Sequence, residues 1–330
     1  MEQKRYTVVD LVKFVSAIFI ISIHTQPLEN INKEISFVLE DILGRMAVPF
    51  FLVCSGYFIG KSSKNTGEIF LPNKEYLKRQ FIKILKLYVG WSLVYFPIVV
   101  YNWNKIGWFS AFAFVDWIIG FFTRGSYYHL WYLISLLYAI PLVYFIMRMV
   151  KKKYYSIIIV VLYAIQVIVY AYNFTVSDFI PNILKICNYF ACIFIAITRV
   201  LPFLLLGIII AQENKGKNTV KMFLINFVCL VIEAYALRVN NKEAVSYIFF
   251  TLPTSYYFFK TILEVEKNIH IRSFKVFRAS TFLYCVHPIF VWVFLEFFKF
   301  KKDIIFCLTI ILSLATWKII EGFGRMRNTQ

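Results

Sequence analysis

Long hydrophobic runs, separated by short polar segments, make up most of this chain. About ten of these runs are long enough for a helix to cross a bilayer, which needs ~20 mostly apolar residues. They cover residues 6–28, 36–59, a stretch that ends near 101, 127–147, 154–172, 190–211, 220–237, 244–263, 277–298 and 304–320. The pattern predicts an all-α integral membrane protein of about ten transmembrane helices, with residues 1–330 as a single polytopic domain.

Three shorter segments break this pattern. Residues 108–122 are aromatic and contain Asp116, and we expect an interfacial or re-entrant helix there. Residues 177–189 are moderately amphipathic and precede the sixth span. Residues 74–86 are strongly basic and lead into the third span, so they are expected to line its cytoplasmic end.

The composition supports a membrane protein. Of the 330 residues, 60% are hydrophobic and 20% are aromatic, and the mean hydropathy is +0.68. A soluble domain of this length does not need so much apolar surface. The first run is not a cleavable signal, because charged residues interrupt it and no small-residue cleavage site follows.

The positive charges fix an expected orientation. The formal net charge is +18, but the lysines and arginines cluster in particular loops. This distribution is typical of cytoplasmic loops beside anionic headgroups, and it argues against a nucleic-acid partner. With ten spans, the basic loops after spans two, four, six and eight lie on the same side as both termini. The termini are therefore predicted to be cytoplasmic in a bacterial plasma membrane, with Lys299, Lys301 and Lys302 as exceptions on the outer side.

The first run carries three ionisable residues, Asp10, Lys13 and His24. Such groups are costly inside a span, so they tend to be paired, to line a wet cavity or to do chemistry. At ~100° per residue, Lys13 and His24 lie on one helix face, about 16 Å apart along the axis. Asp10 is close enough in sequence to pair with Lys13. We hypothesise that Lys13 and His24 face a shared water-filled cavity. The alternatives are a lysine that reaches the interface and a histidine at the helix end.

No sequence feature indicates a metal or a tightly bound cofactor. The six cysteines lie mostly within apolar runs and form no C-x-x-C pair, so packing is their expected role. The chain contains no P-loop, no GxGxxG and no HExxH motif.

Several motifs, in chain order, resemble the membrane acyltransferase-3 family. They are the spacing of Lys13 and His24, which is similar to a basic-x10-His signature; Arg45 and the following VPFFLVCSGYF, with Ser55; HLWYL, with His129 and Trp131; TRVLPFLLLG around Arg199; and STFLYCVHP, with Tyr284 and His287. Lys13 departs from the family, in which many members have arginine. Lysine keeps the charge but loses the bidentate fork.

The resemblance implies transfer of an acyl group, usually acetyl from cytoplasmic acyl-CoA, to a hydroxyl of a sugar, lipid or cell-wall acceptor. Lys13, with its partner Asp10, and His24 would form the catalytic set, in which the imidazole serves as general base. Lys13 and Arg45 would hold the donor arm, its phosphates or the developing oxyanion. Ser55, His129, Trp131, Arg199, Tyr284 and His287 would contribute to substrate binding.

A subset of the family implies a different function. HTQPL, RMAVPFF and YYHLWYL resemble the membrane half of the serine racemases of vancomycin-resistance clusters, which is thought to bring in L-serine for a cytoplasmic racemase domain. The implied partner is such a domain, fused or associated. In a serine transporter, Arg199 or Lys13 would meet the substrate carboxylate, and Asp10 or Glu233 would meet its ammonium group.

Several candidate residues also have a purely structural interpretation. His287 and Pro288 suit a helix kink with a hydrogen-bonded imidazole. Ser55 and Gly56 suit a contact between small residues. Trp131 suits an interfacial anchor or a pocket wall, Glu233 suits a pair with Arg238, and His270 suits a solvated loop.

Overall fold

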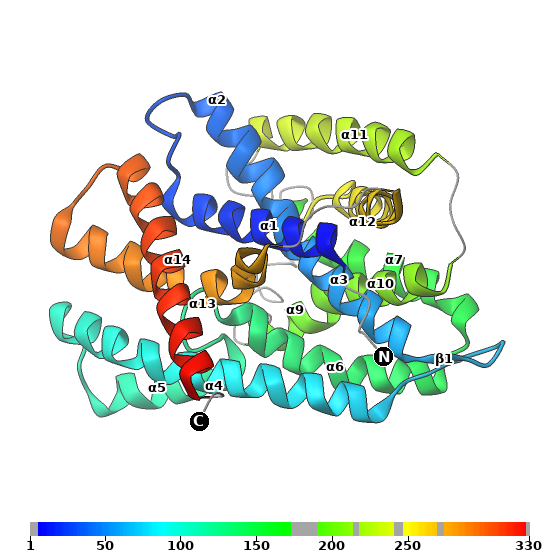
Figure 1. The fold of residues 1–330 in the computed structure, drawn as a ribbon, viewed down its shortest axis with the longest axis horizontal. Helices are drawn as coiled ribbons and strands as arrows, with labels where there is room; N and C mark the ends of the chain where they lie inside the picture. Colours follow the sequence, from blue (N-terminus) through cyan, green and yellow to red (C-terminus); the bar gives the residue numbers. More distant parts are fainter. Residues whose placement is uncertain (1–5, 173–189, 214–217, 241–246, 269–273, 328–330) are drawn as a thin grey trace. The chain divides into compact units, whose positions relative to one another are not determined.

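The computed structural model describes residues 6–172, 190–213, 218–240, 247–268 and 274–327, and these residues are mostly helical (Figure 1). Within these ranges the only strands are β1 (Lys64–Asn65) and β2 (Phe70–Leu71), which pair antiparallel with Lys64 opposite Leu71. The prediction of an all-α protein is therefore confirmed. The amphipathic piece 177–189, Cys187 and His270 lie outside the described residues.

The helical elements follow one another closely along the chain. In order, they are α1 (Thr7–Thr25), α2 (Lys33–Ser36), η1 (Phe37–Leu43), η2 (Gly44–Met46), α3 (Ala47–Ser62), α4 (Lys74–Lys105), α5 (Ala111–Thr123), α6 (Trp131–Met149), η3 (Lys152–Tyr154), α7 (Tyr155–Gln166), η4 (Val167–Ala171), α9 (Ala191–Ile195), η6 (Ala196–Val200), α10 (Leu201–Gln212), α11 (Thr219–Asn240), α12 (Thr251–Asn268), η7 (Lys275–Ala279), α13 (Ser280–Val293), η8 (Phe294–Phe298) and α14 (Lys302–Arg327). Of the η elements, η1, η4, η6 and η8 are π-helical and η2, η3 and η7 are 3₁₀.

Nine helical stretches among the described residues are long and apolar enough to cross a membrane. Their bounds agree with nine of the predicted spans, which confirms a multi-pass membrane protein. The remaining predicted span, 244–263, corresponds to α12, which begins only at Thr251 and carries Lys260, Glu264, Glu266 and Lys267. The count of ten and the cytoplasmic termini stay predictions.

Helix α5 is the short helix that was expected within residues 108–122. Its 13 residues extend only about 20 Å at 1.5 Å per residue, less than the ~30 Å hydrocarbon core. The Ser110 side chain accepts the Ala113 N–H at 3.2 Å and caps its start. Near its end, Arg124 pairs with Asp116 at 2.7 Å, so the one carboxylate of this apolar helix is neutralised.

The chain divides into two compact units. The first comprises Met1–Phe51, Asn218–Tyr235 and Pro253–Gln330, and the second comprises Leu52–Lys217 and Ala236–Leu252. Both units contain membrane-length helices. The expectation of a single polytopic domain stays a prediction.

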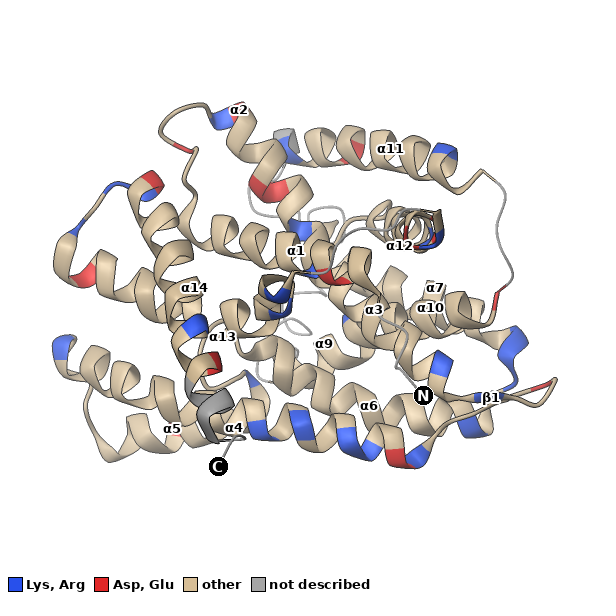
Figure 2. Ribbon diagram, in the orientation of Figure 1, with Lys and Arg blue, Asp and Glu red and all other residues tan. Residues whose placement is uncertain are grey.

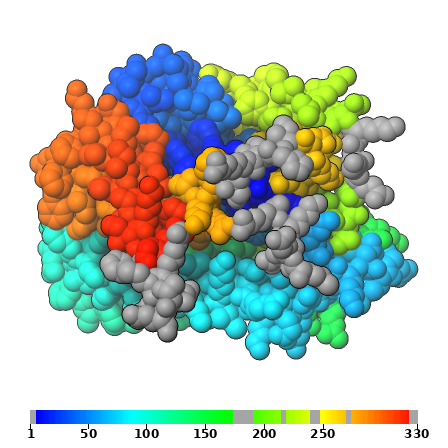
Figure 3. Space-filling view, in the orientation of Figure 1, coloured from blue at the N-terminus to red at the C-terminus, as the bar shows by residue number. Residues whose placement is uncertain are grey.

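In the first unit, α1 packs against α13 and α14. Ala17 and Ile21 of α1 meet Ala279 and Leu283, and all four side chains are fully buried. Figure 3 shows α14, in red, beside the orange α13. Small side chains at this contact allow α1 to lie close to α13, which carries two of the predicted site residues.

A carboxylate from another helix caps the start of α1. Glu266 of α12 accepts the backbone N–H groups of Thr7 at 2.9 Å, Val8 at 2.7 Å and Val9 at 3.2 Å. The first N–H groups of a helix have no partner within it and form the positive end of its dipole. The N-cap residue Tyr6 makes no side-chain cap, so Glu266 supplies the missing acceptors.

In the second unit, the backbones of α3 and α10 touch directly. A Cβ on Gly56 would lie 2.0 Å from the Leu204 carbonyl oxygen, and one on Gly207 would lie 2.1 Å from the Val53 carbonyl oxygen. One turn on, Gln212 Nε2 donates to the Gly60 carbonyl oxygen at 2.7 Å. Only small residues allow this approach, as in small-xxx-small contacts between membrane helices. The interpretation of Gly56 as a small residue at a helix contact is therefore confirmed.

The basic segment forms the first turns of α4, in the second unit. Asn73 caps this helix by accepting the Tyr76 N–H at 3.0 Å. The blue bands along α4 in Figure 2 mark its cations, of which Lys78, Arg79, Lys83 and Lys86 are exposed. The predicted continuity of this segment with the third span is confirmed.

Candidate functional site

The first unit brings together His24 of α1 and His287 of α13. Their rings stack with centroids 5.3 Å apart and an interplanar angle of 24°. The ring of Tyr284, on the same helix as His287, lies 6.4 Å from the His287 ring. Two motifs that are distant in sequence, one with His24 and one with Tyr284 and His287, therefore meet at the His24–His287 stack.

The hydrogen bond of His287 determines which of its nitrogens is basic. His287 is fully buried, and its Nδ1 lies 3.0 Å from the Leu283 carbonyl oxygen. A carbonyl oxygen only accepts, so Nδ1 carries the hydrogen and, in the neutral ring, Nε2 carries the lone pair. His287 therefore has the hydrogen-bonded imidazole that the helix-kink interpretation predicts. The same hydrogen bond leaves Nε2 as the nitrogen that can accept a proton.

Arg45 reaches the same region from a tight turn beside the end of α1. It lies in η2 after Gly44, where an added Cβ would be 2.9 Å from the Ile23 side chain. A glycine therefore lets this turn pack against α1 one residue before His24. The Arg45 guanidinium lies within electrostatic range of the His24 imidazole, and its Nη2 pairs with Asp41 Oδ1 at 3.2 Å.

Asp10 and Lys13 form the predicted pair, near the other end of α1. Lys13 Nζ lies 3.5 Å from Asp10 Oδ1, and the lysine side chain is 24% exposed. The pair lies within the first two turns of the helix. Because α1 is continuous from Thr7 to Thr25, Lys13 and His24 share a helix face at about 16 Å separation along the axis. The shared cavity stays a prediction.

His129 belongs to the second unit, in the loop between α5 and α6. Tyr88 fixes this loop, since its hydroxyl donates to the Phe121 carbonyl and accepts the Ser126 N–H at 3.1 Å. The His129 imidazole is buried, with its ring 4.9 Å from that of Tyr95 in an edge-on arrangement. The rings of Tyr127 and Tyr128 also pack against this imidazole, at 5.8 and 5.5 Å between centroids.

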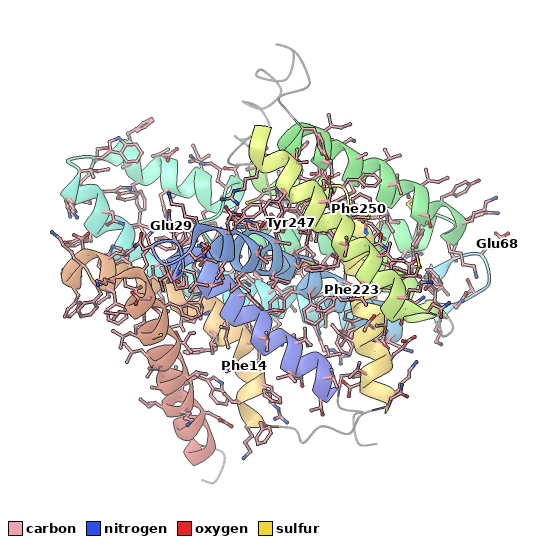
Figure 4. All side chains as sticks on the ribbon, turned by 90° about the horizontal axis from the view of Figure 1, so that it is seen from above. Phe14, Glu29, Glu68, Phe223, Tyr247 and Phe250 are labelled. Atoms are coloured by element: carbon pink, nitrogen blue, oxygen red, sulfur yellow. The ribbon has the colours of Figure 1, made fainter. Side chains whose placement is uncertain are left out.

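Arg199 and Trp131 also meet in the second unit. The Arg199 guanidinium carbon lies 5.4 Å from the centroid of the Trp131 ring, 5.6 Å from that of Tyr170 and 3.9 Å from that of Tyr247. Tyr247 is labelled in Figure 4. Three aromatic rings thus contact this cation, and Trp131 provides one of them.

The predicted residues therefore fall into two groups. Asp10, Lys13, His24, Arg45, Tyr284 and His287 belong to the first unit, whereas Ser55, His129, Trp131 and Arg199 belong to the second. Ser55 lies on α3, half-buried, next to the glycine that contacts α10.

Sequence reasoning missed Asp41, although its i, i+4 spacing to Arg45 is a recognisable signal. It also missed Tyr170 and Tyr247, for which no local signal exists.

Outside the spans, one ion pair connects the ends of two helices in the first unit. Glu29, labelled in Figure 4, follows α1, and Lys302 begins α14. Lys302 donates hydrogen bonds to Glu29 Oε2 and, at 3.1 Å, to Gln26 Oε1. The hydrogen bond and the charge of Lys302 lower the pKa of Glu29 below its ordinary value of 4.5. Lys302, one of the three lysines that the predicted orientation places on the outer side, is thus paired with a carboxylate.

Comparisons with known proteins agree with the motifs. A family model described as an acyltransferase domain matches residues 6–320. Two proteins from Enterococcus faecalis, each named amino-acid racemase, are 30% identical over 165 and 147 residues, which are 50% and 44% of this chain. A serine/alanine racemase from Enterococcus gallinarum is 26% identical over 129 residues, 39% of this chain. These matches cover 22%, 20% and 18% of the relatives' own lengths. No solved structure matches the chain.

Proposed function

Because this chain belongs to the acyltransferase-3 family of membrane proteins, we propose that it is an O-acyltransferase of the bacterial plasma membrane. The proposed donor is cytoplasmic acyl-CoA, with acetyl-CoA as the first candidate. The proposed acceptor is a hydroxyl of an extracytoplasmic or lipid-linked glycan. The observation that carries the proposal is the stacked pair of His24 and His287, with Arg45 within electrostatic range of His24.

His24 is the proposed general base. A hydroxyl is a poor nucleophile at neutral pH, and a positioned neutral imidazole removes its proton as the oxygen attacks the thioester carbonyl carbon. The carbon–sulfur bond then breaks, and the CoA thiolate leaves and takes up the proton. Stacking on the buried His287 supports this role, because it holds the His24 ring in one orientation.

Two cations of the first unit suit the negative charge of this reaction. Arg45 lies in η2, which packs against α1 one residue before His24, and it suits the developing oxyanion of the thioester. Lys13 lies about 16 Å further along α1, a distance suited to the extended arm or the phosphates of the donor. Both cations already have carboxylate partners, Asp41 and Asp10, which hold them in place without a ligand.

The test uses the full-length chain, purified in detergent, with acetyl-CoA. We expect binding of acetyl-CoA and its slow hydrolysis, and a His24→Ala variant that folds but loses turnover by at least about 100-fold. Arg148→Lys is the matched control, because Arg148 is exposed at the end of α6 and bonds only to the Tyr144 hydroxyl among its described contacts. Failure of acetyl-CoA and longer acyl-CoAs to bind would contradict the proposal.

The second candidate function is uptake of L-serine for a cytoplasmic racemase domain, in the context of vancomycin resistance. The names of the three relatives favour it, since each is called a racemase and one is called a serine/alanine racemase. It predicts uptake of radiolabelled L-serine into proteoliposomes without any thioester. A flat uptake trace beside active acetyl-CoA turnover would eliminate this candidate.

A further inference from the structure

Among the described residues, the Arg199 guanidinium has aromatic rings as its neighbours and forms no ion pair with a carboxylate. The nearest ring is that of Tyr247, whose centroid lies 3.9 Å from the guanidinium carbon. Aromatic rings contact a guanidinium through its faces, so its N–H groups, which point outward in the plane, still need acceptors. Nε of Arg199 is buried and has no hydrogen-bond partner in the part of the chain that the structure describes.

The helices around Arg199 cannot supply a counter-charge. Residues 131–149, 155–171, 191–212 and 247–252 contain no aspartate and no glutamate. A cation inside a membrane helix without a carboxylate nearby is costly, and cation–π contacts offset only part of that cost. An anion that enters the pocket would supply what these helices lack.

A second buried polar group lies on the helical stretch that carries Tyr170, and it contacts Thr198, the residue before Arg199. Gln166 is fully buried, one turn before Tyr170, and its Oε1 lies 2.9 Å from the hydroxyl of Thr198. That hydroxyl also lies 2.8 Å from the Phe194 carbonyl oxygen, and it has only one hydrogen to donate. Whichever way the Gln166 amide is turned, one of its polar atoms remains unmet. Buried polar atoms without partners are exceptions that need an explanation.

Two π-helical turns place the side chains of this pocket. Arg199 lies in η6 (Ala196–Val200), and Tyr170 lies in η4 (Val167–Ala171). Each π turn inserts an extra residue and thereby rotates the side chains that follow relative to a regular α-helix. Such insertions cost backbone energy and occur frequently at functional sites. Two of them on helices that pack together indicate a built site.

We propose that Arg199, with the rings of Tyr247, Trp131 and Tyr170, binds the carboxylate of a small substrate. The single positive charge of Arg199 matches a single negative charge, so a carboxylate fits better than a dianionic phosphate. Gln166 then meets a second polar group of the same molecule. The source is a free amino acid or a carboxylate on the acyl acceptor. The choice between these two sources rests on the proposed function. The carboxylate site does not, because it requires no acyl donor.

The first experiment measures binding to the full-length protein in nanodiscs, with no acyl-CoA present. Its probes are L-serine, L-serine amide, propionate and inorganic phosphate. Binding of L-serine at least about tenfold tighter than its amide supports the site with a free amino acid as source. Binding of propionate equal to that of L-serine supports the site with an acceptor carboxylate as source. Equal binding of L-serine and its amide, binding of phosphate alone, or no binding overturns the proposal.

Variants then assign the binding to Arg199. Arg199→Lys keeps the charge but loses the planar fork, and we expect affinity for the bound carboxylate to fall by at least about tenfold. Tyr247→Leu is expected to weaken binding more than Tyr247→Phe, which keeps the ring. Arg148→Lys is the matched control and should bind as the unaltered protein does. Unchanged affinity in both Arg199→Lys and Tyr247→Leu overturns the proposal, and acetyl-CoA hydrolysis in the same samples reports separately on acyl transfer.

Discussion

The contact between α3 and α10 gives a prediction whose size follows from the structure. Gly56→Ala adds one methyl group where the backbones of the two helices touch. The new Cβ would lie 2.0 Å from the Leu204 carbonyl oxygen and 2.7 Å from its carbonyl carbon. Both neighbours are backbone atoms, so no side chain can rotate away to make room.

The cost of this methyl group can be bounded. Ordinary contact begins at 3.4 Å, so the two backbones must separate by about 1.4 Å at this point. Overpacking of a well-packed core costs ~1–3 kcal/mol. The separation also loosens the neighbouring approach of Gly207 to Val53 and lengthens the hydrogen bond from Gln212 to Gly60. The higher helix propensity of alanine relative to glycine offsets up to ~1 kcal/mol of this loss in stability. We therefore expect a net loss of about 1–3 kcal/mol.

The assay compares thermal unfolding of purified variants in one detergent. Gly90→Ala is the matched control, because Gly90 lies inside α4 and an added Cβ there meets nothing within 4 Å. We expect Gly56→Ala to lower the Tm by several degrees and Gly90→Ala to leave it unchanged or to raise it slightly. Equal Tm values for Gly56→Ala, Gly90→Ala and the unaltered protein would refute the direct backbone contact.

Three further predictions concern polar groups. His287→Asn can still donate to the Leu283 carbonyl but lacks the ring that stacks on His24, so acetyl-CoA turnover should fall at least about tenfold; unchanged turnover would show that the stacking does not position His24. Because Lys302 lowers the pKa of Glu29, this pair stabilises the fold above pH 4.5 and less as the pH falls; the Tm of Lys302→Gln should depend less on pH in that range, which parallel melts at several pH values would test. Glu266→Gln should destabilise the protein by about 1–2 kcal/mol, as the loss of a charged helix cap does, and a Tm equal to that of the unaltered protein would contradict this.

Much of this fold could be predicted because its signals are local. A membrane span is a long apolar run, and the described helices begin and end within a few residues of nine predicted runs. Asp10 and Lys13 were predicted to pair because their spacing alone brings them together on a helix. The short α5 was recognisable from its length.

Other features depend on contacts between distant segments, which a single sequence does not encode locally. The stacking of His24 on His287 joins two helices that are more than 250 residues apart in the chain. Glu266 caps α1 across a similar separation. Tyr247 precedes α12, and nothing near it in sequence indicates that it covers Arg199. The π turns η4 and η6 have no hydrophobic pattern that distinguishes them from α-helix, because most of the residues in and around them are apolar.

Lys13, Arg45 and Arg199 differ in their partners, and this difference suggests that substrate selection and catalysis are carried out by different residues. Lys13 and Arg45 each have a carboxylate within a turn of their own helical segment, so both are stable before any substrate arrives. In the described part of the chain, Arg199 contacts aromatic rings and no carboxylate, so it gains more from an incoming anion than either of them. A group that needs its ligand for stability discriminates strongly between ligands with and without the matching charge. We therefore expect Arg199 to select the substrate by its charge, and His24 to carry out the chemistry with cations that are already neutralised.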